Sequence, residues 1–176
     1  MSHRHPSTVL EQSEQGLKSG LLLRLRVSGE SMAPFLRSGD FVVVRAMDAS
    51  RLRRGDLVVV QREGQWVTHR LIGTSCRGWR LRGDNLDLAD PPVDEAEIAG
   101  RVVAVEQDDR LVDMDRLRWR VVNTALGVLL AWEEALYRRA RPPASRLARA
   151  IPPHWMVTAG RAGKAIIYAV RRLLAP

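Results

Sequence analysis

Short apolar runs separated by glycine fill the chain from Leu21 to Gln107. Runs of this length, rich in valine and leucine and bounded by turn residues, predict β-strands. Two of them meet at Glu63 and Gly64, which predict a tight turn. Six such runs therefore predict a mainly β domain over residues 21–110, after a polar leader at residues 1–20: LLLRLRVSG, GDFVVVR, GDLVVVQR, QWVTHRLIG, GWRLRGD and AGRVVAVEQ.

The fourth run, QWVTHRLIG, alternates in character, as expected of a strand whose side chains point to opposite faces in turn. Trp66, Thr68 and Arg70 then share one face, whereas His69 shares the other with Val67 and Leu71. A histidine between two apolar neighbours is an ordinary core or surface residue unless other features single it out.

After Asp115 the apolar spacing becomes helical. One helix is predicted over about 117–141, ended by Pro142 and Pro143, and a second over about 159–174. Residues 116–176 thus form a basic helical extension. They hold 12 Lys and Arg against 2 Asp and Glu, while residues 1–115 hold 16 against 18, so the net charge of +8 comes from the last third of the chain.

Composition adds few constraints on function. Hydrophobic residues at 45% and charged residues at 27% are typical of a folded domain. The single cysteine, Cys76, has no partner for a disulfide or a zinc site. The polar N-terminus has no signal-peptide core, and the longest apolar run, about 12 residues from Val121, is too short to span a bilayer. We therefore expect a cytoplasmic or peripherally membrane-associated protein.

Ser31 is the first residue that suggests chemistry. It follows an apolar run and Gly29, and it precedes Pro34, so the turn can present its hydroxyl at a strand end. Backbone N–H groups of such a turn, chiefly that of Ser31, can face a developing oxyanion. Taken alone, Ser31 is equally explained as a polar turn residue.

The surrounding sequence resembles the LexA and signal peptidase I superfamily of serine peptidases. SMAPFLRSGD matches the family pattern around the nucleophile, here Ser31. RRGDLVVVQ, VTHRLIG and LRGDNLDLADPPVDEAEIAGRVVAV resemble the three later conserved segments, in the same order. The resemblance covers about residues 22–106 and implies the family's β fold and peptidase activity without a metal or organic cofactor.

The resemblance also bears on the general base. Many members use a buried lysine, but the only lysines, Lys18 and Lys164, lie outside the β region. His69 matches the histidine of the archaeal and endoplasmic-reticulum signal peptidases. An imidazole can accept the serine proton and return it to the leaving amine. We therefore expect His69 to be the base.

In the histidine-type relatives an aspartate of the last conserved segment orients the base. Asp84, in Gly83-Asp84-Asn85, is the first choice for this role, and Asp90, before Pro91 and Pro92, is the second. Both are also explained as turn residues. Asp87 is a weaker substitute, and Asp40 and Asp56 are expected to brace turns.

Two features depart from the signal peptidases. Gly29 stands where they commonly have a second serine, so GESM resembles the LexA side of the superfamily. No N-terminal anchor is evident. The first predicted helix instead has apolar residues at helical spacing along 117–137, arginines at both ends of this stretch, and Trp119, Trp132 and Tyr137 around its apolar centre. It either lies on an anionic membrane surface or packs on the β domain, and nucleic-acid binding is not expected without a helix-turn-helix.

Three functions stay open. The first is a peptidase that removes a leader or signal segment from a peptide or preprotein bound as an extended strand. The second is a soluble maturation peptidase or a LexA-like self-cleaving protein. The third is a binding module that has kept the fold without the activity.

Overall fold

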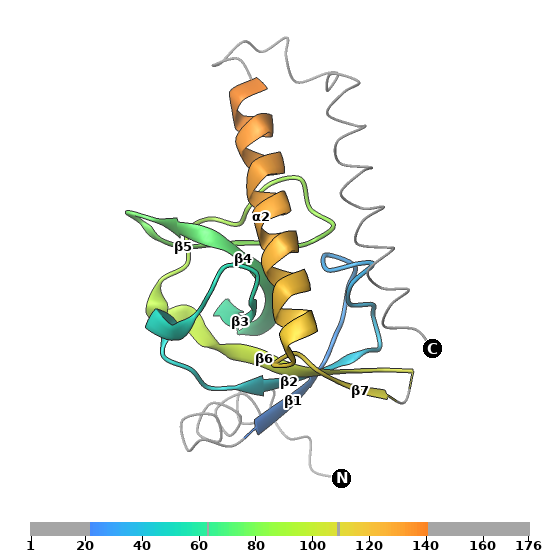
Figure 1. Ribbon diagram of the computed structural model, residues 1–176. Helices are drawn as coiled ribbons and strands as arrows, with labels where there is room; N and C mark the ends of the chain where they lie inside the picture. The colour runs from blue at the N-terminus through green and yellow to red at the C-terminus, as the bar shows by residue number, and fades with distance from the viewer. Residues whose placement is uncertain (1–21, 63, 109, 141–176) are drawn as a thin grey trace.

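The computed structural model describes residues 22–62, 64–108 and 110–140. The predicted leader at 1–20 and the predicted helix at 159–174 lie outside these residues. The described chain forms seven strands, two 3-10 turns and one α-helix, which confirms the mainly β fold with a C-terminal helix (Figure 1). The elements are β1 (Leu22–Arg26), β2 (Phe41–Arg45), η1 (Ala49–Arg51), β3 (Leu57–Arg62), β4 (Gln65–Ser75), β5 (Gly78–Arg82), η2 (Glu95–Glu97), β6 (Ile98–Gln107), β7 (Arg110–Asp113) and α2 (Leu117–Ala140).

All six predicted strands are present, and their neighbours in the sheet are antiparallel. The order is β1-β2-β6-β3-β4-β5, with β7 paired to the end of β6. The sequence did not predict β7, because its four residues form only a short, polar-flanked hairpin with β6. The turn predicted at Glu63 and Gly64 joins β3 to β4, whose Arg62 and Gln65 are paired, and Gly64 has a φ of +73°.

Strand β3 is buried on both faces, which explains its unbroken apolar run. Leu57 and Val59 pack into one apolar cluster, and Val58 and Val60 pack into a second. Residues directly opposite each other in a sheet share a face. His69, opposite Val58, therefore lies on the side of the second cluster, and Arg70, opposite Leu57, lies on the side of the first.

Helix α2 crosses the sheet beside β4 (Figure 1) and buries one side against it. Trp119, Leu126 and Leu130 are at most 3% exposed. The opposite side carries Leu117, Val121 and Trp132, which are more than 60% exposed. One side of this helix thus packs on the β domain, which was the second of the two alternatives for it. Binding of the other side to a membrane surface stays a prediction.

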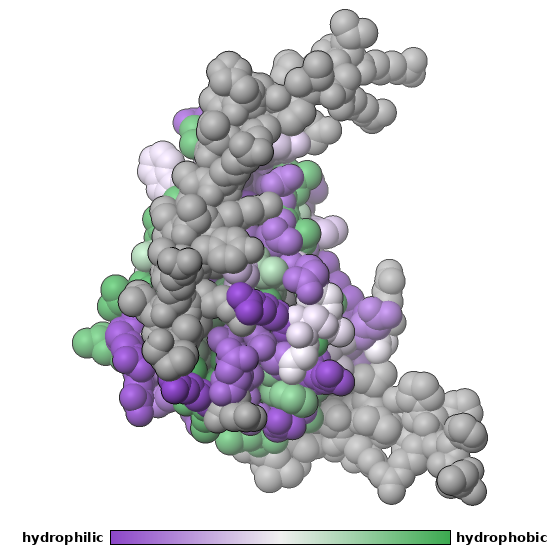
Figure 2. Space-filling view, turned by 90° about the vertical axis from the view of Figure 1, so that its right-hand side faces the viewer, coloured by the Kyte–Doolittle hydropathy of each residue, from purple (hydrophilic) through white to green (hydrophobic). Residues whose placement is uncertain are grey.

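Among the described residues, no helix is long and apolar enough to cross a membrane. The described surface visible in Figure 2 is largely hydrophilic over its lower centre, with apolar residues gathered at its left edge.

Helix α2 approaches the turn before β3 closely at two glycines. A Cβ atom on Gly127 would lie 2.6 Å from the backbone nitrogen of Gly55 and 2.7 Å from its Cα atom. Gly55 also has a φ of +98°, which a residue with a side chain rarely adopts. The turn at residues 53–56 therefore sets how close α2 can lie.

Replacing Gly127 with alanine tests this contact. Helix propensity alone predicts that Gly127→Ala stabilises the protein by about 1 kcal/mol. The contact with Gly55 predicts the opposite sign, a loss of about 1–3 kcal/mol, because backbone atoms must move apart. Urea unfolding measures the difference, with exposed Ala135→Gly as the propensity control. A stabilised Gly127→Ala variant would contradict the described contact.

Asp56 braces the same turn by accepting a hydrogen bond from the backbone N–H of Arg53 at 2.7 Å. Burial raises the pKa of Asp56 above its usual value, although that hydrogen bond and the nearby arginines oppose the rise. A carboxyl whose pKa is raised by folding stabilises the folded state most when protonated. That contribution is complete below the unfolded pKa and is lost as pH rises through the folded pKa.

The variant Asp56→Asn keeps an acceptor for the Arg53 N–H but cannot ionise. We expect the stability of the natural protein relative to Asp56→Asn to fall as pH rises from about 4 to about 7. Denaturant unfolding at several pH values measures the two free energies. A difference that stays constant, or grows with pH, would show that burial does not dominate at Asp56.

Candidate active site

Ser31 lies in the loop between β1 and β2, whose apolar residues are buried in the core and fix its position. Met32, Phe35 and Leu36 are 3%, 0% and 0% exposed, and the N–H of Leu36 donates to the carbonyl of Met32. Gly29, with a φ of +86°, turns the chain just before the serine. This arrangement leaves Ser31 partly exposed on a loop anchored in the core.

Strand β4 brings His69 to Ser31. The Nε2 atom of His69 lies 3.1 Å from the Oγ atom of Ser31, within hydrogen-bond distance. His69 is only 5% exposed and lies near the middle of its strand, where pairing with Val58 of β3 restricts its backbone. Two residues 38 positions apart in sequence are thus brought together as predicted.

Asp90 contacts the other side of the imidazole. Its Oδ2 atom lies 2.6 Å from Nδ1 of His69. A carboxylate here accepts a hydrogen bond from the Nδ1–H group, which leaves the lone pair of Nε2 directed at the Ser31 hydroxyl. Ser31 contacts His69, which contacts Asp90, and this is the connectivity of a catalytic triad.

The expectation that Asp84 contacts His69 is wrong. Both oxygens of Asp84 accept hydrogen bonds from Arg70, at 2.8 Å from Nε and 2.7 Å from Nη2, and both side chains have no exposed surface. The reason is strand alternation, because Arg70 points to the opposite face of β4 from His69. Asp84 neutralises this buried arginine, and Asp90, the second choice, takes the position beside the imidazole.

The loop after β5 carries both aspartates and is tied to the serine loop. The N–H of Asn85 donates a hydrogen bond to the carbonyl of Ser31 at 2.8 Å, and the N–H of Asp90 donates one to the carbonyl of Leu81. A Cβ atom on Gly83 would lie 2.6 Å from the carbonyl oxygen of Ser31. Only glycine allows the two loops to approach this closely, which gives Gly83 a steric role beside the nucleophile.

Arg70 is the residue of this region that the sequence interpretation missed. Besides Asp84, its guanidinium donates to the carbonyl of Gly55 at 3.0 Å and to Oδ1 of Asn123 at 2.7 Å, and it lies over the ring of Phe35. The available signal was its place in an alternating strand, opposite apolar Leu57, since an arginine on a buried face needs a carboxylate partner.

The remaining aspartates have other surroundings. Asp40 accepts hydrogen bonds from the N–H of Arg37 and from Nε2 of Gln107, each at 2.8 Å, and Asp56 braces its turn. These contacts agree with the turn-bracing roles expected for both. Asp87 is exposed and forms no hydrogen bond with His69.

The N–H of Ser31 donates to no acceptor in the part of the chain that the structure describes. It is therefore available to a substrate oxygen, as expected for an oxyanion donor. A hydroxyl, an imidazole and a carboxylate in this order, with a free N–H beside the hydroxyl, can carry out acyl transfer.

Comparisons with known proteins identify the family of the chain. The model of the family described as Peptidase S24-like matches residues 5–103. A LexA repressor of Frankia alni is 38% identical over 87 residues, which are 49% of this chain and 33% of the relative. LexA repressors of a Parafrankia strain and of Frankia casuarinae are 36% and 37% identical over the same length. The chain matches about a third of the length of these relatives. A family match over more than half of the chain shows that the protein belongs to the Peptidase S24-like family.

Proposed function

We propose that this protein is a serine endopeptidase in which Ser31 is the nucleophile, His69 the general base and Asp90 the residue that orients it. The observation that carries the proposal is the continuous chain of contacts from Ser31 Oγ through His69 to Asp90. Family membership supports the reaction class, and the geometry supports the roles.

The chemistry follows from the atoms in contact. Ser31 Oγ attacks the scissile carbonyl carbon while His69 Nε2 takes the hydroxyl proton, and the N–H of Ser31 stabilises the resulting oxyanion. His69 then gives that proton to the leaving amine as the C–N bond breaks, which leaves an acyl-enzyme on Ser31. Water, deprotonated by His69, hydrolyses the ester and restores the serine. Asp90 stays ionised and stabilises the imidazolium.

A groove beside Ser31 supports an extended peptide as substrate. A cavity of about 170 Å³ lies between residues 25–29 and residues 65–68, with Met32 at its base. Strand β4 pairs with β5 only from Arg70 onward, so within the described residues its first part presents an unpaired main-chain edge beside this groove. A peptide strand could pair there, and the small volume favours a small side chain next to the scissile bond.

Two sources of that peptide are consistent with this site. The first source is a leader or signal segment of another chain, which the open groove could bind. The second is a segment of the protein itself, which the similarity to LexA repressors suggests. We favour a separate chain, because histidine replaces the lysine base expected of LexA-type proteins. Repressor activity is not proposed, since α2 is the one α-helix within residues 22–140 and it packs on the sheet.

Hydrolysis by the purified full chain tests the proposal. Ser31→Ala should reduce cleavage of peptides with small residues at the scissile bond at least about 10³-fold and leave the fold unchanged. Ser38→Ala, in the same loop but exposed, is the control. Mass spectrometry identifies the products. Cleavage rates at several protein concentrations separate the two sources, because self-cleavage within one molecule has a rate independent of protein concentration. Cleavage by Ser31→Ala at the natural rate would exclude Ser31, and inactivity of the folded natural protein would favour the binding-module alternative.

The two aspartates should fail in different ways when each is replaced by asparagine. Asp90→Asn should lower kcat by about 10⁴-fold, because the imidazole loses the group that fixes its tautomer, with a stability change below about 1 kcal/mol. Asp84→Asn should cost about 3–5 kcal/mol of stability, because Arg70 is left buried without a counter-ion. Denaturant unfolding and single-turnover cleavage measure both effects. Equal stability losses in the two variants would contradict these roles.

A further inference from the structure

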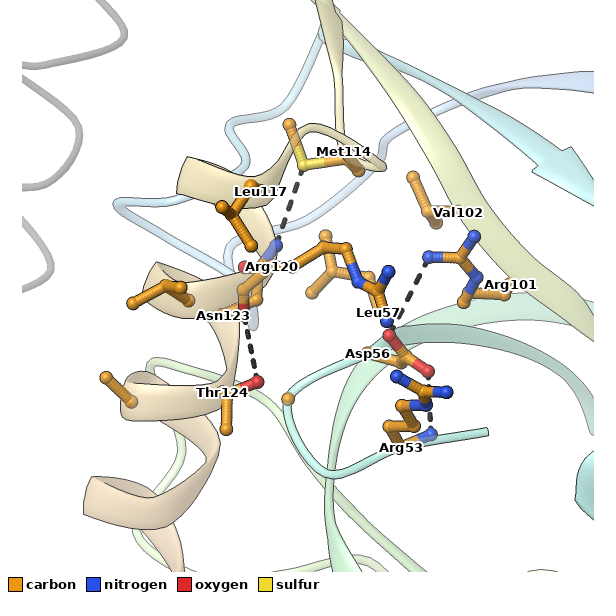
Figure 3. Close-up of a pocket in the computed structure, with 13 residues that line it drawn as sticks. Arg53, Asp56, Leu57, Arg101, Val102, Met114, Leu117, Arg120, Asn123 and Thr124 are labelled. Carbon is orange, nitrogen blue, oxygen red and sulfur yellow. Dashed lines mark hydrogen bonds and ion pairs between the residues drawn. The ribbon is translucent and has the colours of Figure 1, made fainter. Parts of the chain in front are cut away.

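A second cavity, of about 540 Å³, lies away from the serine, between the start of α2, the turn before β3 and strand β6 (Figure 3). Its walls are partly apolar, and Leu117 and Val121 are among the residues that α2 contributes. No residue of the proposed triad lines it.

Three arginines from three different elements converge in this cavity. The guanidinium groups of Arg53, Arg101 and Arg120 gather around the carboxylate of Asp56 (Figure 3). Arg101 is the only one of the three with an ion pair within the described residues. It lies 3.8 Å from Asp56 and also contacts Asp115.

One carboxylate within the cavity does not satisfy three guanidinium groups. In the described part of the chain, the side chains of Arg53 and Arg120 donate no hydrogen bond, and Asp56 instead accepts the backbone N–H of Arg53. The cavity therefore holds an excess of positive charge and unused N–H donors. An anion with several acceptor oxygens, such as a phosphate, would complement both.

Leu117 and Val121, which line the cavity, belong to an exposed apolar side of α2. Leu117 is 77% exposed and Val121 is 61% exposed, and the same side of the helix carries Trp132 at 65% and Leu136 at 44%. A soluble anion would use the arginines but leave this apolar surface in water. An anionic amphiphile would use both, with its charge in the cavity and its apolar chains along the helix.

We propose that this cavity binds the phosphate group of an anionic phospholipid, with Leu117 and Val121 in contact with the adjoining acyl chains. Arg120 and Arg53 donate to the phosphate oxygens, and Arg101 holds Asp56 aside. The proposal does not depend on the peptidase mechanism, since the two sites share no residue. It would place the peptidase domain at a membrane surface through a specific lipid rather than through net charge alone.

Binding of the full chain to vesicles of phosphatidylglycerol and phosphatidylcholine tests the proposal against a matched control. Arg120→Gln and Arg118→Gln remove the same charge two residues apart on α2, but Arg118 lies over Trp119 and does not line the cavity. Loss of a general surface charge should weaken both variants about equally, by roughly fivefold. Loss of a charged hydrogen bond should weaken Arg120→Gln by roughly a further tenfold.

Equal binding by the two variants would overturn the site and leave only electrostatic adsorption. Arg53→Gln provides a second variant in case Arg120→Gln unfolds, because its backbone hydrogen bond to Asp56 remains, and circular dichroism checks each fold. If both cavity variants lose binding as predicted, the proposal gains its main support.

The source of the phosphate is tested separately. Glycerol phosphate at millimolar concentration should compete weakly with vesicles, and Leu117→Ser should reduce vesicle binding without changing the binding of glycerol phosphate. If glycerol phosphate binds the natural protein as tightly as the vesicles do, or if Leu117→Ser has no effect, the ligand is a soluble phosphate and the lipid assignment is wrong.

Discussion

The burial of one guanidinium group, that of Arg70, is the constraint on which the rest of this structure depends. Arg70 has no exposed surface, and a charge in such a place is tolerated only when it is paired and hydrogen-bonded. Its partners come from three separate regions: Asp84 after β5, the carbonyl of Gly55 before β3 and Asn123 on α2. Satisfying one side chain therefore fixes a loop, a turn and a helix around strand β4.

The proposed active site lies on the other face of the same strand. Because His69 and Arg70 are adjacent, β4 directs the imidazole toward Ser31 and the guanidinium toward α2. The loop that supplies Asp84 to Arg70 also supplies Asp90 to His69 and is joined to Ser31 through Asn85. Helix α2 extends this support: Arg82 of β5 donates to the carbonyl of Leu130 and pairs with Glu133, while Arg80 pairs with Glu134. The inner side of the helix thus completes the charge pairing of β4 and β5, and its outer side carries the exposed apolar residues Leu117, Val121 and Trp132.

Local patterns predicted the strands, whereas Ser31 and His69 were expected from the resemblance to the LexA and signal peptidase I superfamily, and the structure brings these two side chains together. Glycine-bounded valine runs have few other structures to adopt, and the motif around Ser31 leaves little room for an alternative nucleophile. The choice between Asp84 and Asp90 could not be made in this way. Both lie in one irregular loop. Asp90 reaches His69 because Arg70 binds Asp84 on the opposite face of the strand. The contacts of Arg70 with Asn123, and of Arg80 and Arg82 with α2, join residues about 50 positions apart, and no periodicity in the sequence reports such distant pairs.

The proposed mechanism requires that His69, held by Asp90, activates Ser31. Covalent labelling with a serine-directed phosphonate, followed by peptide mapping, measures that activation without any knowledge of the substrate. We expect a single label on Ser31 of the folded natural protein, and its loss in a folded His69→Ala variant. A folded natural protein that takes no label, or one in which Ser31 is labelled equally fast without His69, would contradict it.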